Sequence, residues 1–217
     1  MSTAMLEKQT QVESVLTLAP VVAVVVIEEL SHAVPLARAL VRGGIRAIEV
    51  TLRTPIALDA IRAIANEVDR AVVGAGTLVT PADLAAAQKA GARFGVSPGA
   101  TPALLDAGDD SELPYLPGAA TATEAMRLFE RGYTLQKFFP ATPAGGPDYL
   151  RALSSPLPGI RFCPTGGISA ATASEWLAVP NVVCVGGSWM CGAKLLRAGD
   201  WFAVETFAQT ATALRPA

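Results

Sequence analysis

Several residue types are scarce in this chain of 217 residues, and each scarcity excludes a class of protein. The chain has one histidine and three cysteines, none of them in a Cys-x-x-Cys pair. These residues provide neither the ligand cluster of a transition-metal site nor a disulfide framework, so we expect no metal, no cofactor and a reducing cytoplasm. The 17 Lys and Arg do not outnumber the 19 Asp and Glu, and the chain therefore lacks the net basic charge typical of nucleic-acid binding.

Long apolar runs are also absent. The most apolar run, residues 21–27, is far shorter than the ~20 residues that a membrane-spanning helix needs. The N-terminus carries Glu7 and Lys8 in a helix-like stretch, without the basic-then-apolar pattern of a secretion signal. Hydrophobic residues nevertheless make up 51% of the chain, which is enough to bury a large core and excludes intrinsic disorder. We therefore expect a core-rich cytoplasmic protein that does not enter a membrane.

Short β-branched runs alternate with Ala- and Leu-rich helical segments from end to end. Strands are predicted over 21–27, 47–52, 71–76, 93–97, 114–117, 135–139, 161–164 and 182–185. Helices are predicted over 33–42, 56–67, 81–90, 123–131 and 170–177, among others. Nearly continuous apolar strands that alternate with helices are typical of a parallel sheet that helices cover.

About eight such units in 217 residues predict a single (β/α)8 barrel that spans residues 1–217, with residues 1–18 as an extra helix that caps the barrel. A doubly wound open sheet is the competing architecture, but it usually carries Gly-x-Gly-x-x-Gly after the first strand. Here Ile27-Glu28-Glu29-Leu30 follows that strand instead. The absence of a linker or charge block also favours one barrel domain.

Lys137 is the most informative residue, because chemistry in such barrels takes place at the carboxyl ends of the strands. It lies within a predicted strand and next to Phe138 and Phe139, whereas the other three lysines fall in helical or loop contexts. An amine that faces the barrel interior is removed from water, which favours the neutral form that attacks carbonyl groups. A lysine that extends outward from a strand end is an equally good interpretation of this segment alone.

Three more polar residues lie in or after predicted strands. Glu49 lies within the second strand, where it could form a structural ion pair with Lys137 or move protons beside a Schiff base. Arg53 follows the same strand and suits a carboxylate clamp. Thr77 follows Gly74-Ala75-Gly76, where glycines allow a ligand to approach closely.

Paired glycines follow the last two predicted strands, at Gly166-Gly167 and Gly186-Gly187. This pattern matches the recurrent phosphate site of the barrel, although two tight turns would give it as well. Together these residues describe a pocket for a phosphorylated keto compound with a carboxylate. The remaining polar groups are predicted to be structural: His32 caps or decorates a helix, Cys163 and Cys184 are core residues, and Asp109, Asp110 and Glu112 form a solvated turn.

The chain resembles the 2-keto-3-deoxy-6-phosphogluconate aldolases. Six segments carry the resemblance in order and with similar spacing: Glu49–Thr54, Gly74–Thr77, Ser97–Gly99, Lys137–Ala141, Phe162–Ile168 and Gly186–Trp189. The resemblance implies a metal-independent class I aldolase on a (β/α)8 barrel, usually a homotrimer, that yields pyruvate and glyceraldehyde 3-phosphate in the Entner–Doudoroff pathway. Members of the family often also act on 4-hydroxy-2-oxoglutarate.

The resemblance also implies roles for individual residues. Lys137 would be the Schiff-base lysine and Glu49 the general acid and base. Arg53 and Thr77 would hold the pyruvate carboxylate, and Thr165 would help to set stereoselectivity. The backbone of Gly166, Gly167, Gly187 and Ser188 would bind the phosphate.

Two alternatives stay open at this point. One is a sister aldolase for the galactonate epimer of the substrate, although Thr51-Leu52-Arg53 is more similar to the gluconate branch. The other is a catalytically silent phosphate-binding barrel with an assembly or regulatory role. A buried lysine that faces a carboxylate would argue against a silent barrel, because such a barrel has no use for the pair.

Overall fold

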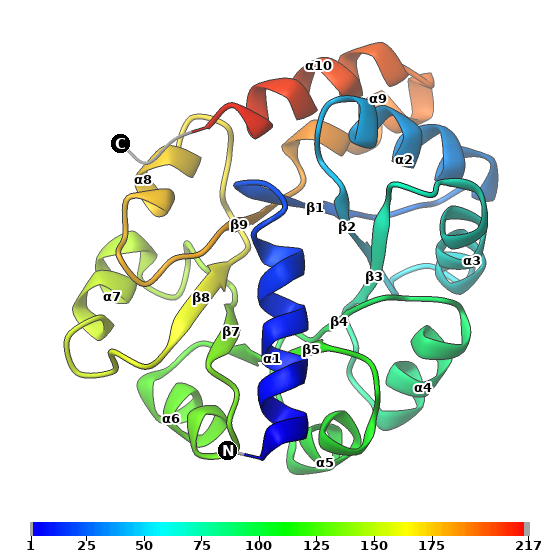
Figure 1. Cartoon of the computed structure of the whole chain (residues 1–217). Coiled ribbons are helices and arrows are strands. Elements are labelled where there is room, and N and C mark those ends of the chain that lie inside the picture. The colour runs from blue at the N-terminus through cyan, green and yellow to red at the C-terminus, as the bar shows by residue number, and fades with distance from the viewer. Residues whose placement is uncertain (1, 215–217) are drawn as a thin grey trace.

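The computed structural model describes residues 2–214 and shows an α/β fold with a curled parallel sheet (Figure 1). Its strands are β1 (Val21–Val25), β2 (Ala47–Thr51), β3 (Val72–Gly76), β4 (Gly95–Val96), β5 (Tyr115–Leu116), β6 (Gly118–Ala119), β7 (Leu135–Phe138), β8 (Arg161–Pro164) and β9 (Val185–Gly187). Six of them pair in the order β5-β4-β3-β2-β1-β9, and the other three in the order β6-β7-β8. Single parallel bridges, Phe162 to Val182 and Thr165 to Gly186, connect the β8 and β9 segments. The predicted α/β class with a parallel sheet is therefore confirmed.

Helices surround the curled sheet (Figure 1). They are α1 (Thr3–Leu16), α2 (Ala33–Arg42), α3 (Ala57–Glu67), α4 (Pro81–Lys89), α5 (Pro102–Asp110), α6 (Ala122–Glu130), α7 (Gly146–Leu153), α8 (Ala173–Leu177), α9 (Ala193–Ala198) and α10 (Trp201–Thr212), with short 3-10 turns η1 (Leu30–His32) and η2 (Trp189–Cys191). Local sequence fixes several boundaries. At the start of α4, Thr80 and Asp83 form a reciprocal capping box, and Pro81 occupies the first turn. Gly43 follows the last residue of α2 as its C-cap.

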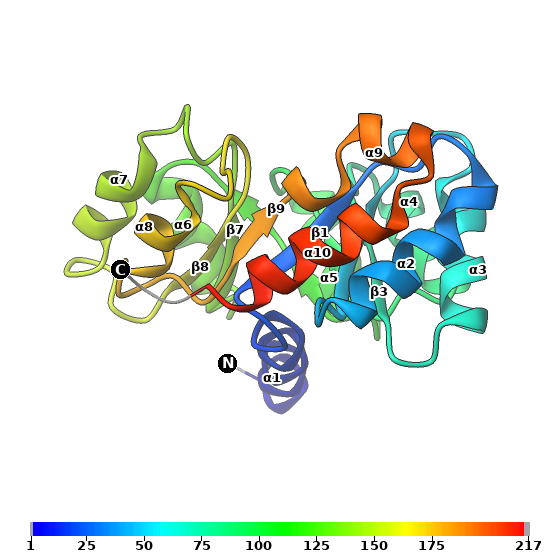
Figure 2. The same ribbon diagram turned by 90° about the horizontal axis from the view of Figure 1, so that it is seen from above.

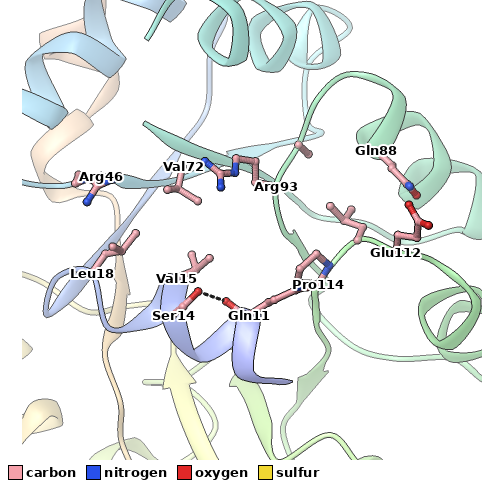
Figure 3. Close-up of a pocket in the computed structure, with 12 residues that line it drawn as sticks. Gln11, Ser14, Val15, Leu18, Arg46, Val72, Gln88, Arg93, Glu112 and Pro114 are labelled. Atoms are coloured by element: carbon pink, nitrogen blue, oxygen red, sulfur yellow. Dashed lines mark hydrogen bonds between the residues drawn. The ribbon is translucent and has the colours of Figure 1, made fainter. Parts of the chain in front are cut away.

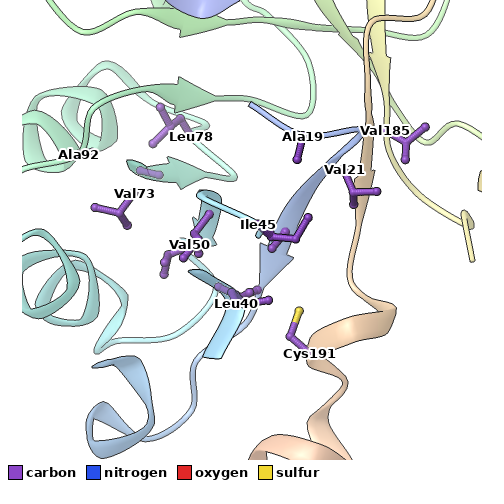
Figure 4. Packing of buried hydrophobic residues seen from close by; sticks show 14 of the residues in the cluster. Ala19, Val21, Leu40, Ile45, Val50, Val73, Leu78, Ala92, Val185 and Cys191 are labelled. Carbon is purple, nitrogen blue, oxygen red and sulfur yellow. The ribbon is translucent and has the colours of Figure 1, made fainter. Parts of the chain in front are cut away.

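Alternate residues of each strand face two different cores, as the period of two in a β-strand requires. Val21, Ala23 and Val25 of β1 join the large cluster that includes Leu36 and Leu40 of α2, so this face of the sheet packs on the helices. Part of that cluster is shown in Figure 4. The opposite strand faces join a second cluster inside the curl of the sheet, to which helix α1 also contributes. Its members are Val12, Val15, Leu16, Val22, Ala47, Val72, Phe94, Val96, Leu116, Leu135, Cys163 and Cys184.

Helix α1 lies across one open end of the curled sheet, at the amino ends of the strands (Figures 1 and 2). Its apolar residues Val12, Val15 and Leu16 pack into the interior cluster. Arg161 at the start of β8 donates a 2.7 Å hydrogen bond to the Glu13 carboxylate on the same helix. This contact lowers the pKa of Glu13 and raises the pKa of Arg161, because each charge stabilises the other.

The predicted strand 114–117 is in fact two short strands that flank Pro117. β5 pairs with β4, and β6 pairs with β7, so the sheet changes partners at this point. The proline is the physical reason, since it has no N–H to donate to a ladder.

The last predicted strand, 182–185, is displaced toward the C-terminus, because the ladder with β1 begins at Val185 and continues to Gly187. The prediction of a solvated acidic turn was wrong for Asp109 and Asp110, which end helix α5. Asp109 is half-buried and accepts hydrogen bonds from Tyr133 and Arg131.

Among residues 2–214, no helix combines the length and the apolar character needed to span a membrane.

Candidate active site

Lys137 and Glu49 meet inside the curled sheet. Lys137 is in β7 and Glu49 in β2, two strands that do not pair with each other, yet Lys137 Nζ donates a 3.1 Å hydrogen bond to Glu49 Oε1. Lys137 is only 5% exposed and Glu49 only 3%. The predicted interior position of Lys137 is therefore correct, and the outward-pointing alternative is excluded. Lys137 Nζ also lies 5.3 Å from the centre of the Phe139 ring.

Two glycines make room for the polar side chains of the interior. A Cβ atom at Gly76 of β3 would overlap the Glu49 carboxyl group, and one at Gly186 of β9 would overlap the hydroxyl group of Thr165. From the sequence, the glycines before Thr77 were expected to allow close approach of a ligand. In the structure, the missing Cβ atoms accommodate the protein's own functional side chains.

Arg53 and Thr77 lie together just beyond the carboxyl ends of β2 and β3. The Arg53 Nε atom donates a 3.3 Å hydrogen bond to Thr77 Oγ1. Thr77 has a backbone φ of 62°, an uncommon conformation for a residue other than glycine. Such local strain is often found at functional sites. Arg53 is exposed, so its guanidinium group keeps donors for an incoming anion.

Thr165 directly follows β8, and its side chain has an unusual environment. Its hydroxyl oxygen is buried and has no hydrogen-bond partner in the structure. A buried polar atom without a partner is costly unless a ligand or water satisfies it. Cys163, two residues earlier in the chain, lies on the same face of the sheet as Thr165 and is in register with Lys137 of β7. The unpaired hydroxyl of Thr165 therefore lies about two residues further toward the carboxyl ends of the strands than Lys137.

The loop after β8 carries backbone donors that the protein itself does not use. The N–H groups of Gly167 and Ser188 take part in none of the hydrogen bonds described within residues 2–214. The bridge between Thr165 and Gly186 brings this loop next to the end of β9. The prediction that glycine pairs follow both strands is correct for Gly166-Gly167 and wrong for Gly186-Gly187, which lie within β9 because they pair with Val22 and Ala23.

The cysteines do not compete with Lys137 as nucleophiles. Burial raises the pKa of the Cys191 thiol to about 12, and its Sγ atom lies 3.4 Å from the carbonyl oxygen of Val24. A hydrogen bond with Cys163 and burial raise the pKa of Cys184 well above its ordinary value. Cys163 and Cys184 are buried, as expected for core residues.

His32 and the acidic residues do not form a metal centre. His32 occupies the position before α2 but makes no capping hydrogen bond with its side chain, so of the two predicted roles it decorates the start of the helix and does not cap it. Its ring instead packs edge-on against Trp201 at 5.5 Å and lies 3.6 Å from the Glu29 carboxylate. Within the part of the chain that the structure describes, no group of three His, Cys, Asp or Glu residues could hold a metal ion.

The site therefore combines a buried amine, a carboxylate at hydrogen-bond distance, an exposed guanidinium group and unused backbone donors. This set can form an imine with a ketone, transfer protons and bind two anionic groups. The sequence analysis did not assign a role to Phe139, whose ring faces Lys137 Nζ, or to Gly76. The signal for Phe139 was its position next to Lys137, but the fold is needed to show that its ring turns toward the amine.

Comparison with known proteins agrees with this geometry. Residues 12–207 match the family described as KDPG and KHG aldolase, the aldolases for 2-keto-3-deoxy-6-phosphogluconate and 4-hydroxy-2-oxoglutarate. The KHG/KDPG aldolase of Escherichia coli (strain K12) is 49% identical over 203 residues, which cover 94% of this chain and 95% of that protein.

Two solved structures are similar as well. A KDPG aldolase from Legionella pneumophila, with pyruvate captured as a covalent carbinolamine intermediate, is 43% identical and has a TM-score of 0.91, covering 93% of this chain and 98% of that one. The KDPG aldolase of Zymomonas mobilis ZM4 with 3-phosphoglycerate is 43% identical and has a TM-score of 0.89, covering 95% of this chain and 97% of that one. By this match over most of its length, the chain belongs to the KDPG and KHG aldolase family.

Proposed function

We propose that this protein is a class I aldolase that cleaves 2-keto-3-deoxy-6-phosphogluconate to pyruvate and glyceraldehyde 3-phosphate, and 4-hydroxy-2-oxoglutarate to pyruvate and glyoxylate. The observation that carries the proposal is the buried hydrogen bond between Lys137 Nζ and Glu49 Oε1. A buried ion pair adds little to stability compared with a well-packed apolar pair, so its presence favours a chemical role over a silent phosphate-binding barrel.

Lys137 supplies the nucleophile. Its amine attacks the C2 carbonyl of the substrate, and the resulting carbinolamine loses water to give a protonated imine. The attack requires a neutral amine, and the 3.1 Å contact gives the lysine proton a direct path to Glu49. Glu49 returns this proton to the hydroxyl group that leaves the carbinolamine as water, so it is a carboxylate again for the next step. The imine then withdraws electrons from C3, which prepares the C3–C4 bond for cleavage.

Glu49 moves the protons of the next two steps. Its carboxylate takes the proton of the C4 hydroxyl as the C3–C4 bond breaks, and the aldehyde product leaves. The electron pair of that bond remains on the pyruvate fragment as an enamine. Glu49 returns the proton to C3, and water then hydrolyses the imine to release pyruvate. One carboxylate can serve both steps because it gives back the proton that it took.

The residues around the pair position the substrate. Arg53 and Thr77, which are already hydrogen-bonded to each other, bind the carboxylate beside C2. The unpaired hydroxyl of Thr165 contacts the substrate near its reacting carbons and contributes to stereoselectivity. The unused N–H groups of Gly167 and Ser188, with the backbone of Gly166 and of Gly187 at the end of β9, hold the phosphate.

A steady-state assay tests the function directly. The purified protein is mixed with 2-keto-3-deoxy-6-phosphogluconate, its galactonate epimer or 4-hydroxy-2-oxoglutarate, and pyruvate is measured with lactate dehydrogenase. We expect turnover of the gluconate compound and of 4-hydroxy-2-oxoglutarate, with the galactonate epimer slower. If none of the three substrates yields pyruvate, the proposed activity is excluded.

Ser188→Asp tests the phosphate site. Ser188 is exposed and has a backbone φ of −115°, so the protein can accept the new side chain without strain. The added carboxylate should repel the phosphate and raise KM for the phosphorylated substrate roughly 30- to 150-fold, since a juxtaposed like charge costs several kcal/mol. KM for 4-hydroxy-2-oxoglutarate, which has no phosphate, should change far less. Ser188→Asn is the neutral control, and an equal rise for both substrates in Ser188→Asp would place the phosphate elsewhere.

We also propose that residues 1–217 form one (β/α)8 barrel domain, with residues 1–18 as a helix that closes one end. The adjacent strands β5 and β6, which pair with β4 and β7, and the bridges between the β8 and β9 segments support a closed ring. Residue 1 and residues 215–217 of this range lie outside the part of the chain that the structure describes. Free cysteine thiols at Cys163 and Cys184, only 3.5 Å apart, support a cytoplasmic location.

The proposed assembly is a homotrimer. Several large apolar side chains are exposed, among them Phe202 at 81% and Val79 at 56%, and exposed apolar surface is a common feature of subunit contacts. Light scattering after size exclusion should give about 67 kDa, three times the 22.4 kDa of one chain. A mass of about 22 kDa at micromolar concentration would refute the trimer.

A further inference from the structure

A pocket of about 600 Å³ lies at the end of the curled sheet opposite the active site (Figure 3). One wall is helix α1, with Gln11, Ser14 and Val15. The other wall is formed by the amino ends of the strands, where Arg46 precedes β2 and Arg93 precedes β4. A volume of this size suits a small metabolite. None of the residues assigned to the aldolase reaction contributes to this pocket.

The two arginines give the pocket its charge. In Figure 3 the Arg93 side chain extends along the strand wall toward Val72, and Arg46 lies beyond Val72 on the same side. The Arg93 guanidinium group makes no hydrogen bond or ion pair within residues 2–214, and Arg46 donates only to the carbonyl oxygen of Arg70. The single carboxylate in the lining, Glu112, lies beside Gln88 at the far end of the pocket (Figure 3).

A third arginine at this end of the sheet provides a contrast. Arg161 is the first residue of β8, and the fold gives it a carboxylate on the same helix, Glu13 of α1, at 2.7 Å. The polar residues with which α1 lines the pocket of Arg46 and Arg93 are Gln11 and Ser14, which carry no charge. The structure thus neutralises the arginine outside the pocket and leaves two guanidinium groups inside it available.

We propose that this pocket binds a small organic dianion. Arg46 and Arg93 would hold its phosphate or carboxylate groups, because a guanidinium group donates two parallel hydrogen bonds to either. The Gln11 side-chain amide can donate a further hydrogen bond, whereas the Ser14 hydroxyl already donates to the carbonyl oxygen of Gln11. Val15, Leu18 and Val72 can contact the carbon atoms of the ligand. The ligand would contact both α1 and the strands, and would stabilise the packing of α1 on the end of the curled sheet that it covers. The proposal is independent of the aldolase reaction.

Nuclear magnetic resonance can test the site locally, without interference from anion binding at the active site. The amide signals of Gln11 and Ser14 are followed at low ionic strength during titration with inorganic phosphate, with succinate, and with erythritol as a neutral compound. We expect saturable shifts with at least one of the anions, no shifts with erythritol, and weaker binding when potassium chloride is added. Saturation by phosphate alone would identify a phosphorylated ligand, and saturation by succinate alone a dicarboxylate. The absence of saturable shifts with both anions would overturn the proposal.

Variants define the contribution of the arginines. In the double variant R46Q/R93Q, the Kd for the anion, measured from the Gln11 and Ser14 amide signals, should rise by at least about tenfold. This is the expected loss of affinity when charge-assisted hydrogen bonds are removed. The control R38Q/R62Q makes the same change of charge at two exposed arginines on α2 and α3, and should leave the Kd unchanged. Equal Kd values in both double variants would contradict the proposal.

Ser14→Glu provides a test that does not depend on the loss of an arginine. The new carboxylate on α1 should pair with the free guanidinium groups, in the way that Glu13 pairs with Arg161. We expect anion binding to weaken as in R46Q/R93Q while the melting temperature stays at or above that of the parent protein. Binding of parental strength in Ser14→Glu would mean that the anions do not occupy this pocket.

Discussion

Borohydride added to the protein and pyruvate should fix a three-carbon adduct on Lys137 and on no other lysine. Lys137 is the buried member of the four lysines and contacts Glu49, whereas Lys89 and Lys194 are exposed. Peptide mass mapping locates the adduct. An adduct on Lys89 or Lys194, or no adduct, would exclude the Schiff-base mechanism.

Lys137→Met should abolish the adduct and lower kcat by roughly 10⁶-fold, the size of the loss when a covalent nucleophile is removed from an enzyme. It leaves the buried Glu49 carboxylate without its cation, so the free energy of unfolding should also fall, by about 3–5 kcal/mol. Circular dichroism at the assay temperature separates the two effects. Lys89→Met is the matched control, and it should retain both the adduct and the parental kcat. A Lys137→Met protein that is folded and active would contradict the assignment.

Glu49→Gln should separate imine formation from proton transfer. Glutamine keeps the shape of the side chain in the space next to Gly76 but cannot accept a proton at neutral pH. We expect borohydride trapping of pyruvate on Lys137 to persist while kcat falls by roughly 10²–10⁴-fold, the usual contribution of general acid–base catalysis. Exchange of the pyruvate methyl protons with deuterated solvent should slow in parallel, because it uses the same proton transfer.

Glu67→Gln is the control for this experiment, since Glu67 is an exposed carboxylate at the end of α3. It should leave both kcat and methyl exchange unchanged. If Glu49→Gln turned over within about threefold of the parent, a different group would have to act as the base. The substrate phosphate and a nearby hydroxyl group would then be the next candidates.

The sequence predicted the repeated strands and helices well because each strand is a short, β-branched apolar run between helical segments. It did not predict the division of 114–119 into two strands, because that division depends on which neighbour each residue meets on either side of Pro117. The helix that ends at Asp110 was missed for a related reason. The two aspartates resemble a solvated turn until Arg131 and Tyr133 are brought to Asp109.

For the site, a charge in an apolar strand was sufficient to select Lys137 and Glu49, but their contact could not be derived from 88 residues of separation along the chain. The resemblance supplied roles for Arg53, Thr77 and Thr165, and the structure adds the hydrogen bond between the first two and the unpaired hydroxyl of the third. The pocket between α1 and the strands gave no signal in the sequence, because its two arginines are unremarkable until the helix that faces them is known.

The glycines opposite Glu49 and Thr165 have a consequence for the evolution and engineering of this enzyme. A methyl group at Gly76 would overlap the Glu49 side chain, and one at Gly186 the Thr165 side chain, both of them in the candidate active site. Selection for catalysis would reject such a change. Mutations at these two positions should therefore affect activity as mutations in the candidate site do, although glycine carries no reactive group. A library designed to alter substrate preference should keep both of them as glycine.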